Sequence, residues 1–600
     1  MARPSGEARR ARVPILAAFV ASLDGSSNAE GQGTMIVGID LGTTNSLCAV
    51  FRDGEARLVP NALGETLTPS AVHLDVDGAI SVGRAAKERL SAEPHRATAK
   101  FKRLMGTDRT TKLGGREFRP EELSALVLGS LRADAEAYLD EPVTEAVISV
   151  PAYFNDVQRK ATIAAARMAG LEVRRLVNEP TAAALAYGVM DREAENTFLI
   201  VDLGGGTFDV SILEMFSGVM EVRSSAGDAF LGGEDFTDRV TAHLLEELGL
   251  KTDGLDPADL ARLRKLADGA KHRLGTQASA EIGFRMGEEE RTLTLTRETF
   301  ERLGEPLLNR LRLPIQRAIQ DAGLTASGID RIFLVGGATR MGAVRSLVTR
   351  LFDRFPEHGI DPDTVVALGA AVQAGLVERD EALDEMVMTD VCPFTLGHET
   401  SNELAPGKRE YGLFAPLIER NTTVPASRSH QVFTLNPGQT KIGLNIYQGE
   451  APYVKDNVKI GAYTVAVPYN AKESEGLDVR FTYDNSGVLE VVATSLSTGK
   501  ASTLIIESNP GSMSPKEIAE RFKALERIKR HPREEAANEA VLARLSAAYA
   551  NSLGERRDFI AGALSRFQAV LESYDKRAIE DTRGQMTELL EGLEAEDVFR

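Results

Sequence analysis

The stretch Ile36-Val-Gly-Ile-Asp-Leu-Gly-Thr-Thr-Asn-Ser46 recurs in outline as Phe198-Leu-Ile-Val-Asp-Leu-Gly-Gly-Gly-Thr-Phe-Asp209, so that Asp40 returns 162 positions later as Asp202. Each copy is a short apolar run that ends in Asp-Leu-Gly, which predicts a strand entering a tight turn. Glycine has no Cβ, so such a turn bends sharply and its N–H groups can approach phosphate oxygens. The aspartate at each strand end is a hard oxygen ligand of the kind that Mg²⁺ takes, usually through its waters. Two half-sites of this kind predict two similar lobes that close on one nucleotide.

The composition limits the class of protein. With 600 residues the chain is too long for one core, and three or four domains are expected. The formal net charge of −18 argues against nucleic acid as a main partner, because neutralising phosphates needs a basic face. Cys48 and Cys392 are the only cysteines, and each is flanked by apolar residues. This favours buried thiols in a reducing, cytoplasmic compartment over a disulfide.

Residues 1–34 precede the first predicted strand and have two interpretations. Arg9, Arg10 and Arg12 stand before a short apolar stretch, 13–21, which resembles a weak secretory signal. That stretch is too short to span a bilayer, so no membrane partner is expected. The alternative is that Met35 is the natural start and that 1–34 is a disordered or wrongly assigned extension. We favour the alternative, because an enzyme that consumes a nucleotide would lack it outside the cytoplasm.

The character of the chain changes twice after Met35. Between residues 35 and 382, apolar β-type runs alternate with helical patterns, which indicates α/β architecture. From 391 to 508, short strands alternate with turn residues and predict a β-sandwich-like domain, and 509–600 is helix-forming and charged. Residues 383–390 are a linker, for which a plain spacer role stays open. Individual predictions include strands at 145–150 and 331–335, a helix at 156–169, and a helix at 257–274 that begins with Asp256 as N-cap and Pro257 in the first helical position.

A set of short motifs occurs in one order along the chain: Gly38-Ile-Asp-Leu-Gly-Thr-Thr-Asn-Ser46, Phe101-Lys-Arg-Leu-Met-Gly106, Val150-Pro-Ala-Tyr-Phe-Asn-Asp156, Asn178-Glu-Pro-Thr-Ala-Ala183, Asp202-Leu-Gly-Gly-Gly-Thr-Phe-Asp209, Leu231-Gly-Gly-Glu-Asp-Phe236 and Val335-Gly-Gly-Ala-Thr-Arg-Met341. Singly, the glycine motifs are weak indications of phosphate binding. Together the set resembles the DnaK-type seventy-kilodalton heat-shock chaperone family, from Ile36 to about Thr503 with a looser tail. The resemblance implies a multidomain protein: a two-lobed α/β actin-like ATPase domain, a β-sandwich peptide-binding domain and a short α-helical lid. It also implies an ATP-dependent chaperone that binds and releases unfolded or extended polypeptides, with a place in stress response.

The resemblance assigns roles around the nucleotide. It implies Lys102, Glu179, Asp202 and Thr207 as catalytic residues, and Asp40, Asp202 and Asp209 as holders of Mg²⁺, mostly through water, with Glu179 and Asp209 near any K⁺. The positions that it implies for contact with ATP are Gly42, Thr43, Thr44, Gly204, Gly205, Gly206, Gly232, Gly233, Lys271, Gly336, Gly337, Arg340 and Asp363.

Two departures lie on the adenosine side. Asp268 stands where the family usually has glutamate, and Gly275 stands where it usually has serine. The expected consequence is a changed nucleotide affinity and exchange rate rather than a changed nucleotide. His272 is expected either as an exposed helical residue or stacked on the adenine.

The resemblance also implies communication between domains. Pro151 and Arg159 resemble the family's switch, by which the ATP state of the first domain reaches the second, and Asp390 joins them as an allosteric residue. Arg175, Asn178 and Asp390 fall where the family contacts the J-domain of co-chaperones, although Arg175 alone could be an ordinary surface charge. A nucleotide exchange factor is a further partner that the resemblance allows.

Thr400, Phe433, Ile442 and Leu444 match positions of the family's peptide groove, with ordinary sandwich core as the alternative for the three apolar ones. His398 and Ser401 replace residues that are usually apolar, so the groove is expected to be more polar and its client preference different. The linker Met386-Val-Met-Thr-Asp390 and the short lid without an acidic tail look closest to the HscC-like branch of the family.

Two other functions remain open. A small-molecule kinase could be built on the same two lobes, but it would have no need of a strand-rich domain at 391–508. A holdase or scaffold could bind ATP without hydrolysing it, and the intact Lys102, Glu179, Asp202 and Thr207 argue against that.

Overall fold

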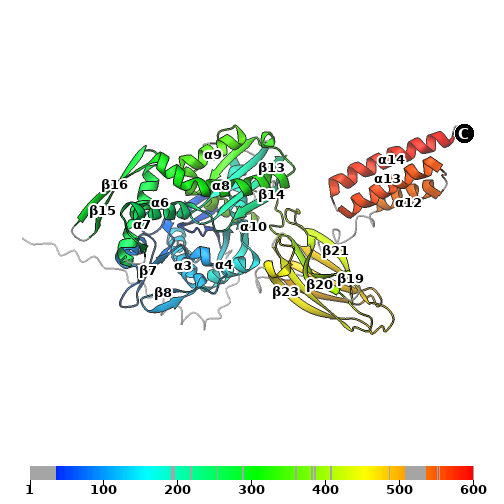
Figure 1. Ribbon diagram of the computed structural model, residues 1–600, viewed down its shortest axis with the longest axis horizontal. Coiled ribbons are helices and arrows are strands. Elements are labelled where there is room, and N and C mark those ends of the chain that lie inside the picture. Colours follow the sequence, from blue (N-terminus) through cyan, green and yellow to red (C-terminus); the bar gives the residue numbers. More distant parts are fainter. Residues whose placement is uncertain are drawn as a thin grey trace, which may run out of the picture.

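The computed structural model describes residues 35–190, 196–216, 219–252, 255–286, 289–357, 361–379, 383, 387–405, 408–484, 487–506, 536–550, 552, 554–573 and 575–598. Two α/β lobes, a β-rich region and a helical bundle follow one another along the chain (Figure 1). The predicted extension 1–34, linker residues 384–386 and the predicted start of the lid at 509 lie outside the described residues. Among the described helices, none combines the length and the apolar character needed to cross a membrane.

The first lobe is built on a sheet with the strand order β11-β10-β1-β2-β3, with β4 beside β2. Strand β1 pairs parallel with β10 and antiparallel with β2, so the first Asp-Leu-Gly turn joins the two strands of a hairpin. The sheet comprises β1 (Ile36–Asp40), β2 (Asn45–Arg52), β3 (Glu55–Val59), β4 (Thr68–Pro69), β10 (Glu145–Val150) and β11 (Glu172–Asn178). Smaller sheets of this lobe contain β5 (Ala71–Leu74), β6 (Ile80–Val82), β7 (Ala97–Ala99), β8 (Thr111–Leu113) and β9 (Arg116–Phe118).

The second lobe repeats this arrangement in a sheet with the order β17-β12-β13-β14-β18. Strand β12 pairs parallel with β17 and antiparallel with β13, so the second Asp-Leu-Gly turn also joins a hairpin. The duplication predicted from sequence is therefore a duplication of strand pairing. The sheet comprises β12 (Asn196–Leu203), β13 (Phe208–Phe216), β14 (Val219–Asp228), β17 (Arg331–Val335) and β18 (Val387–Thr389), and β15 (Ser279–Met286) pairs separately with β16 (Glu289–Thr296).

Two helices, α5 (Glu179–Met190) and α10 (Val365–Glu378), join the lobes through a shared core that includes Val147 of the first sheet and Ile200 of the second. A Cβ on Gly369 would lie 1.6 Å from the carbonyl oxygen of Ala182, so only glycine allows α10 to cross α5 this closely. The first lobe also contains α2 (Arg84–Ala92), the 3₁₀ helix η2 (Phe101–Leu104), α3 (Pro120–Leu139) and α4 (Asp156–Met168). The second contains α6 (Gly233–Glu247), α7 (Pro257–Arg273), α8 (Arg297–Asp321), α9 (Gly342–Phe352) and the 3₁₀ helices η4 (Ala326–Gly328) and η5 (Gly337–Arg340).

The β-rich region consists of two four-stranded antiparallel sheets that enclose one core, which includes Leu396, Ile446, Val479 and Phe481. One sheet has the order β20-β19-β22-β23 and the other β21-β24-β25-β26. These strands are β19 (Leu396–Ala405), β20 (Lys408–Ile418), β21 (Ala426–Phe433), β22 (Lys441–Gln448), β23 (Val458–Ala466), β24 (Gly476–Tyr483), β25 (Leu489–Ser495) and β26 (Ala501–Ile506), with the 3₁₀ helix η7 (Val454–Asp456) before β23. The predicted sandwich character is confirmed for the described residues.

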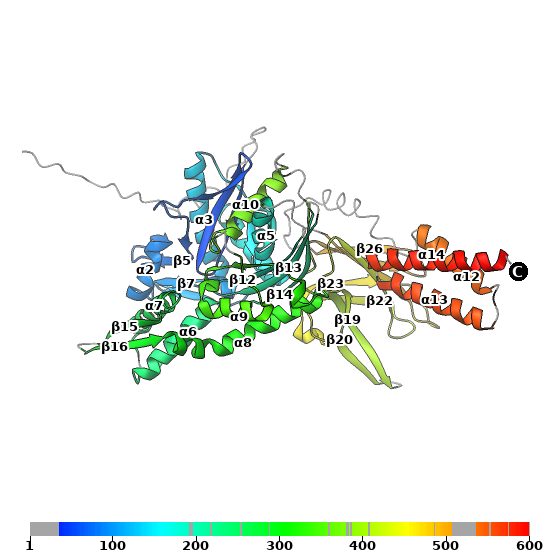
Figure 2. The same cartoon turned by 90° about the horizontal axis from the view of Figure 1, so that it is seen from above.

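Helices α12 (Ala536–Ala550), α13 (Gly554–Ser573) and α14 (Lys576–Val598) form a bundle with a core of its own, which includes Phe567 and Leu590. In both views this bundle lies on the side of the β-rich region away from the two lobes (Figures 1 and 2). Cys48 and Cys392 are both buried and free, as predicted from their neighbours. Burial raises the pKa of each thiol to about 12.

Candidate functional site

The two Asp-Leu-Gly turns face each other across a cavity of about 390 Å³ between the lobes. A Cβ on Gly205 would lie 2.0 Å from Oγ1 of Thr44, and one on Gly206 would lie 2.8 Å from Oγ1 of Thr43. A larger residue at either position would have to displace these threonine side chains or move the turns. The glycines are therefore required by the contact between the lobes as well as by the turn itself.

The cavity is lined by nearly all the residues predicted to bind nucleotide or to act on it. They are Asp40, Gly42, Thr43, Thr44, Lys102, Glu179, Asp202, Gly204, Gly205, Thr207, Gly233, Lys271, Gly336, Gly337, Arg340 and Asp363. Gly206, Gly232 and Asp209 are not among its lining residues. Gly232 supports the turn from behind, because a Cβ there would meet the backbone N of Gly206 at 2.4 Å.

A group of buried carboxylates surrounds Lys102 at the floor of this cavity. Nζ of Lys102 donates to Oε1 of Glu179 at 2.7 Å, and both side chains are almost fully buried. Burial, reinforced by the charge of Glu179, raises the pKa of Asp40 to about 7 and that of Asp202 well above its ordinary value. The same two causes raise the pKa of Asp209 to about 8. Lys102 therefore compensates the negative charge only in part.

This uneven charge balance fits a divalent cation next to a polyphosphate. Among the described residues, no three His, Cys, Asp or Glu side chains converge as a direct metal site. Mg²⁺ beside phosphates usually keeps several waters and is bound through one or two carboxylates, and Asp40 and Asp202 both line this cavity. A Mg²⁺–nucleotide complex would add both the missing positive charge and phosphate oxygens for the glycine turns.

The far end of the cavity, where the adenosine is expected, is held by ion pairs. Nζ of Lys271 donates to Oγ1 of Thr237 at 2.8 Å and pairs with Asp268 at 2.8 Å, so the shorter acid still reaches this lysine. Arg340 pairs with Asp363 at 2.8 Å across the cavity wall. His272 also lines the cavity, and its side chain is 70% exposed at the mouth. Burial lowers the pKa of His272, with the charge of Asp268 acting in the opposite direction.

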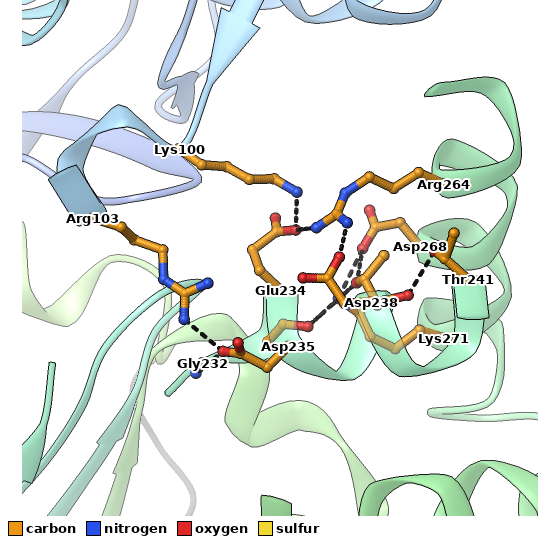
Figure 3. Close-up of polar contacts among 12 residues, drawn as sticks. Lys100, Arg103, Gly232, Glu234, Asp235, Asp238, Thr241, Arg264, Asp268 and Lys271 are labelled. Atoms are coloured by element: carbon orange, nitrogen blue, oxygen red, sulfur yellow. Dashed lines mark hydrogen bonds and ion pairs between the residues drawn. The ribbon is translucent and has the colours of Figure 1, made fainter. Parts of the chain in front are cut away.

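A network of ion pairs joins the lobes beside this cavity (Figure 3). Lys100, next to η2 of the first lobe, pairs with Glu234 on α6 of the second. Arg264 of α7 donates to the same carboxylate at 2.9 Å. A second bridge runs from Nη2 of Arg103 to Oδ2 of Asp235 at 2.7 Å. Sequence reasoning missed this network, because the two bridges between the lobes join residues more than a hundred positions apart and carry no local signal.

Lys100→Ala is expected to speed the release of bound nucleotide about five- to tenfold, which corresponds to about 1–1.4 kcal/mol. Glu234 keeps Arg264 as a partner in its own lobe, so the variant cuts a link between lobes without leaving a buried charge unpaired. The measurement is stopped-flow dissociation of a fluorescent ADP analogue.

Lys265→Ala is the matched comparison for that variant. Lys265 also pairs across the lobes, with Glu88 at 2.7 Å, but both side chains are more than half exposed. Exposed ion pairs contribute little free energy, so the rate of nucleotide release is expected to change by less than about threefold. Equal release rates for wild type and Lys100→Ala would contradict the role given to Lys100.

Hydrogen bonds connect the cavity floor to the predicted linker. Oδ1 of Asp209 accepts from the backbone N of Tyr153 at 3.0 Å, in the segment that follows Pro151. Arg159 donates to the carbonyl of Phe154 at 2.9 Å in the same segment, and to Oδ1 of Asn178 at 2.7 Å.

The linker end of this chain of contacts is Asp390. Asn178 donates through Nδ2 to Oδ2 of Asp390 at 3.1 Å, and the backbone N of Val391 donates to Oδ1 at 2.8 Å. Burial raises the pKa of Asp390, and the Val391 N–H, the charges of Arg175 and Arg159 and the Asn178 bond act against it. The structure thus brings together the predicted residues Arg159, Asn178 and Asp390, while Pro151 lies buried in the adjoining segment.

The β-rich region docks directly on the second lobe. Arg420 holds Asp321 at the end of α8 through two bonds of 2.9 and 3.0 Å, and Asn421 donates to the same carboxylate at 2.9 Å. Linker strand β18 extends the second sheet by pairing parallel with β14. Sequence reasoning did not find Asp321 or Arg420, which are charged residues of ordinary appearance in the sequence.

The predicted groove residues separate into two kinds. Ile442 and Leu444 are 7% and 3% exposed and belong to the sandwich core, so the core alternative describes their packing. Phe433 is 54% exposed at the end of β21, and Thr400 is exposed on β19. The core alternative is therefore wrong for Phe433.

Comparison with known families finds one match that covers most of the chain. The family described as Hsp70 protein matches residues 36–113 and 109–598. The matched residues include both lobes, the β-rich region and the helical bundle.

Proposed function

The chain belongs to the Hsp70 protein family, whose members are ATP-dependent chaperones that use Mg²⁺ and act on unfolded polypeptides, and from this premise we propose a specific cycle for it. In this proposal the two lobes hydrolyse ATP, and the β-rich region binds an extended polypeptide segment. The nucleotide state reaches the polypeptide site through the contacts of Asp390 and Asp321. The observation that carries the proposal is the series of hydrogen bonds that runs from Asp209, behind the cavity, through the segment of Tyr153 and Phe154, Arg159 and Asn178 to Asp390 of the linker.

In the ATPase half of the cycle, ATP would be the donor of the phosphoryl group, and bound Mg²⁺ would neutralise the charge that develops as that group is transferred to water. The backbone of the two glycine turns would hold the β- and γ-phosphates, with Thr207 beside them. Lys102 would orient the attacking water and face the charge that develops on the phosphoryl oxygens. Asp40 and Asp202 would hold the metal through water, and Glu179 would keep Lys102 in place. Most of the rate enhancement would then come from positioning and electrostatics.

Coupling between ATP hydrolysis and polypeptide binding would use the contacts that dock the linker and the β-rich region on the lobes. Asp209 holds Tyr153, and the segment after Pro151 is held in turn by Arg159. A shift of that segment on hydrolysis would weaken the Arg159–Asn178–Asp390 series and release the linker. The β-rich region and the helices would then close on the polypeptide. To transmit a signal, ATP has to favour the docked conformer by a few kcal/mol, at about 1.4 kcal/mol per tenfold shift.

A J-domain co-chaperone is proposed to act on the same contacts. Arg175 lies half-buried on β11, and its charge is felt by Asp390, which bonds to Asn178. A partner that touches this surface could alter the series of contacts without reaching the nucleotide. The HscC-like branch remains our proposal for the relationship within the family, and it is supported by the Thr389-Asp390 linker and the replacements at 398 and 401.

The proposal is tested by mixing the protein, ATP and an unfolded peptide and measuring phosphate release. We expect the peptide to accelerate release several-fold, with no phosphorylated small product. A phosphorylated small molecule would instead identify a kinase, and tight ATP binding without phosphate release would identify a scaffold. A truncated chain without the β-rich region and the helices should keep its full activity only if the protein is a kinase.

A further inference from the structure

An unpaired polar atom lies inside the β-rich region, far from the nucleotide cavity. His398 on β19 is 2% exposed, and its Nδ1 lies 3.0 Å from the carbonyl oxygen of Glu399. Its Nε2 is buried and has no hydrogen-bond partner in the described part of the chain. Buried polar atoms in native proteins are almost always paired, and an unpaired one costs about 1–3 kcal/mol. The bare Nε2 therefore needs a functional explanation.

The protonation of His398 follows from its contacts. A carbonyl oxygen can only accept, so Nδ1 carries the ring proton and Nε2 is a hydrogen-bond acceptor. Burial lowers the pKa of His398, the Glu399 contact raises it, and the charge of His430 lowers it further. The net pKa is below the ordinary value, so the ring is neutral at neutral pH. Its free nitrogen is suited to a donor group and unsuited to a carboxylate.

The direction of Nε2 follows from the same geometry. His398 is paired with Ile446, a core residue, so its ring lies on the inner face of the sheet, and Nε2 is on the edge of the ring away from the carbonyl oxygen of Glu399. His430 on β21 of the facing sheet is next to it there, with ring centroids 5.8 Å apart. His430 is paired with Val479, a core residue, and paired residues point to the same face of a sheet. Since His430 is exposed, the space between the sheets opens to solvent at this point.

Apolar side chains lie on both strands. Val432, the next position of β21 on the same face as His430, is partly buried against the sandwich core, whereas Phe433 lies on the opposite face and is 54% exposed. Leu404 on β19 and Leu435 just after β21 are 57% and 39% exposed. Arg409 of β20 joins the two sides, with Nη2 at 3.3 Å from Glu403 and at 3.4 Å from the carbonyl oxygen of Leu435. An extended polypeptide that entered between the sheets here would meet the apolar Val432 and the acceptor of His398.

We propose that Nε2 of His398 accepts a hydrogen bond from a side chain of the bound polypeptide. The groove would then select extended segments in which an amide or hydroxyl donor, from Asn, Gln, Ser or Thr, interrupts an apolar run. This inference rests on the proposed peptide-binding function and specifies its substrate. His430, which covers His398, would move aside as the segment enters.

The test uses the full-length protein with ADP and two labelled heptapeptides that are identical except for Asn or Leu at the central position. Fluorescence anisotropy gives the Kd of each. Wild type is expected to bind the Asn peptide about five- to tenfold more tightly than the Leu peptide, which corresponds to about 1–1.4 kcal/mol. His398→Ile and the more flexible His398→Met both remove the acceptor, and each should reverse the preference. His430→Ala keeps the acceptor and should keep the preference for Asn.

The outcomes separate the two levels of the proposal. If wild type and the His398 variants bind peptides with the same Asn-to-Leu ratio, the inference is overturned and the peptide-binding function stands. A preference of wild type for Leu would overturn the inference as well. If neither peptide binds any form and no peptide stimulates phosphate release, the proposed function fails, and the inference fails with it.

Discussion

Lys102→Ala is expected to lower the single-turnover rate constant of ATP hydrolysis by about 100- to 1,000-fold, the usual effect of removing one preorganised charge partner of a transition state. Nζ of Lys102 is buried 2.7 Å from Glu179, among carboxylates whose pKa values are raised by burial. A charge so placed acts in a low dielectric and does not reorganise during the reaction. Rapid mixing of the enzyme with radiolabelled ATP and quenching at set times measures the rate constant.

Two further variants separate chemistry from folding in that experiment. Lys102→Ala leaves Glu179 buried without its cation, and breaking a buried pair from one side costs about 3–5 kcal/mol. The double variant Lys102→Ala/Glu179→Gln removes the stranded charge and should recover thermal stability while hydrolysis stays slow. Lys112→Ala, at an exposed position on β8, should match wild type in both. A folded Lys102→Ala protein with the wild-type rate constant would remove Lys102 from the mechanism.

Local features of the fold were predictable because they depend on neighbouring residues. The strand predicted at 145–150 is β10, and the helix predicted from 156 is α4, which Asn155 caps by accepting from the backbone N of Gln158. The helix predicted to begin at Pro257 does so, with Asp256 accepting from Ala258 at its N-terminus. The duplicated glycine turns predicted two lobes, because each turn requires a strand on either side.

Long-range contacts were beyond such reasoning. Nothing near Lys100 in sequence indicates Glu234, and nothing near Arg420 indicates Asp321, because charged side chains look alike until the fold pairs them. The resemblance implied that Ile442 and Leu444 line a groove, which stays a prediction, and the structure adds that both side chains are buried in the sandwich core. The resemblance implied an apolar residue at the position of His398. Only the structure shows which of its nitrogens is paired.

The second large effect is expected from Asp390→Asn, which should reduce stimulation of the ATPase by peptide and by a J-domain protein about five- to thirtyfold. Both carboxylate oxygens of Asp390 accept hydrogen bonds, one from Asn178 and one from the backbone of Val391. An asparagine amide offers one acceptor oxygen and one donor NH₂ group, so one of these two donors would face another donor. A lost hydrogen bond that leaves its partner unsatisfied costs about 1–2 kcal/mol. A loss of coupling free energy of that size corresponds to the expected reduction of about five- to thirtyfold.

The readout for Asp390→Asn is the ratio of stimulated to unstimulated steady-state phosphate release, because a merely unstable protein would lower both rates together. Asn178→Ala removes the partner side chain and should reduce the same ratio by a similar factor. If the hydrogen bond between Asn178 and Asp390 carries the effect, combining the two variants should add little, since both remove the same interaction.

Asp353→Asn is the matched control, because Asp353 is exposed at the end of α9 in a left-handed conformation that asparagine accepts. Equal stimulation of wild type and Asp390→Asn would show that the docked linker does not carry the signal and would shift attention to the direct contacts of the β-rich region with the lobes, such as Asp321–Arg420 and the Asp156–Gln448 hydrogen bond.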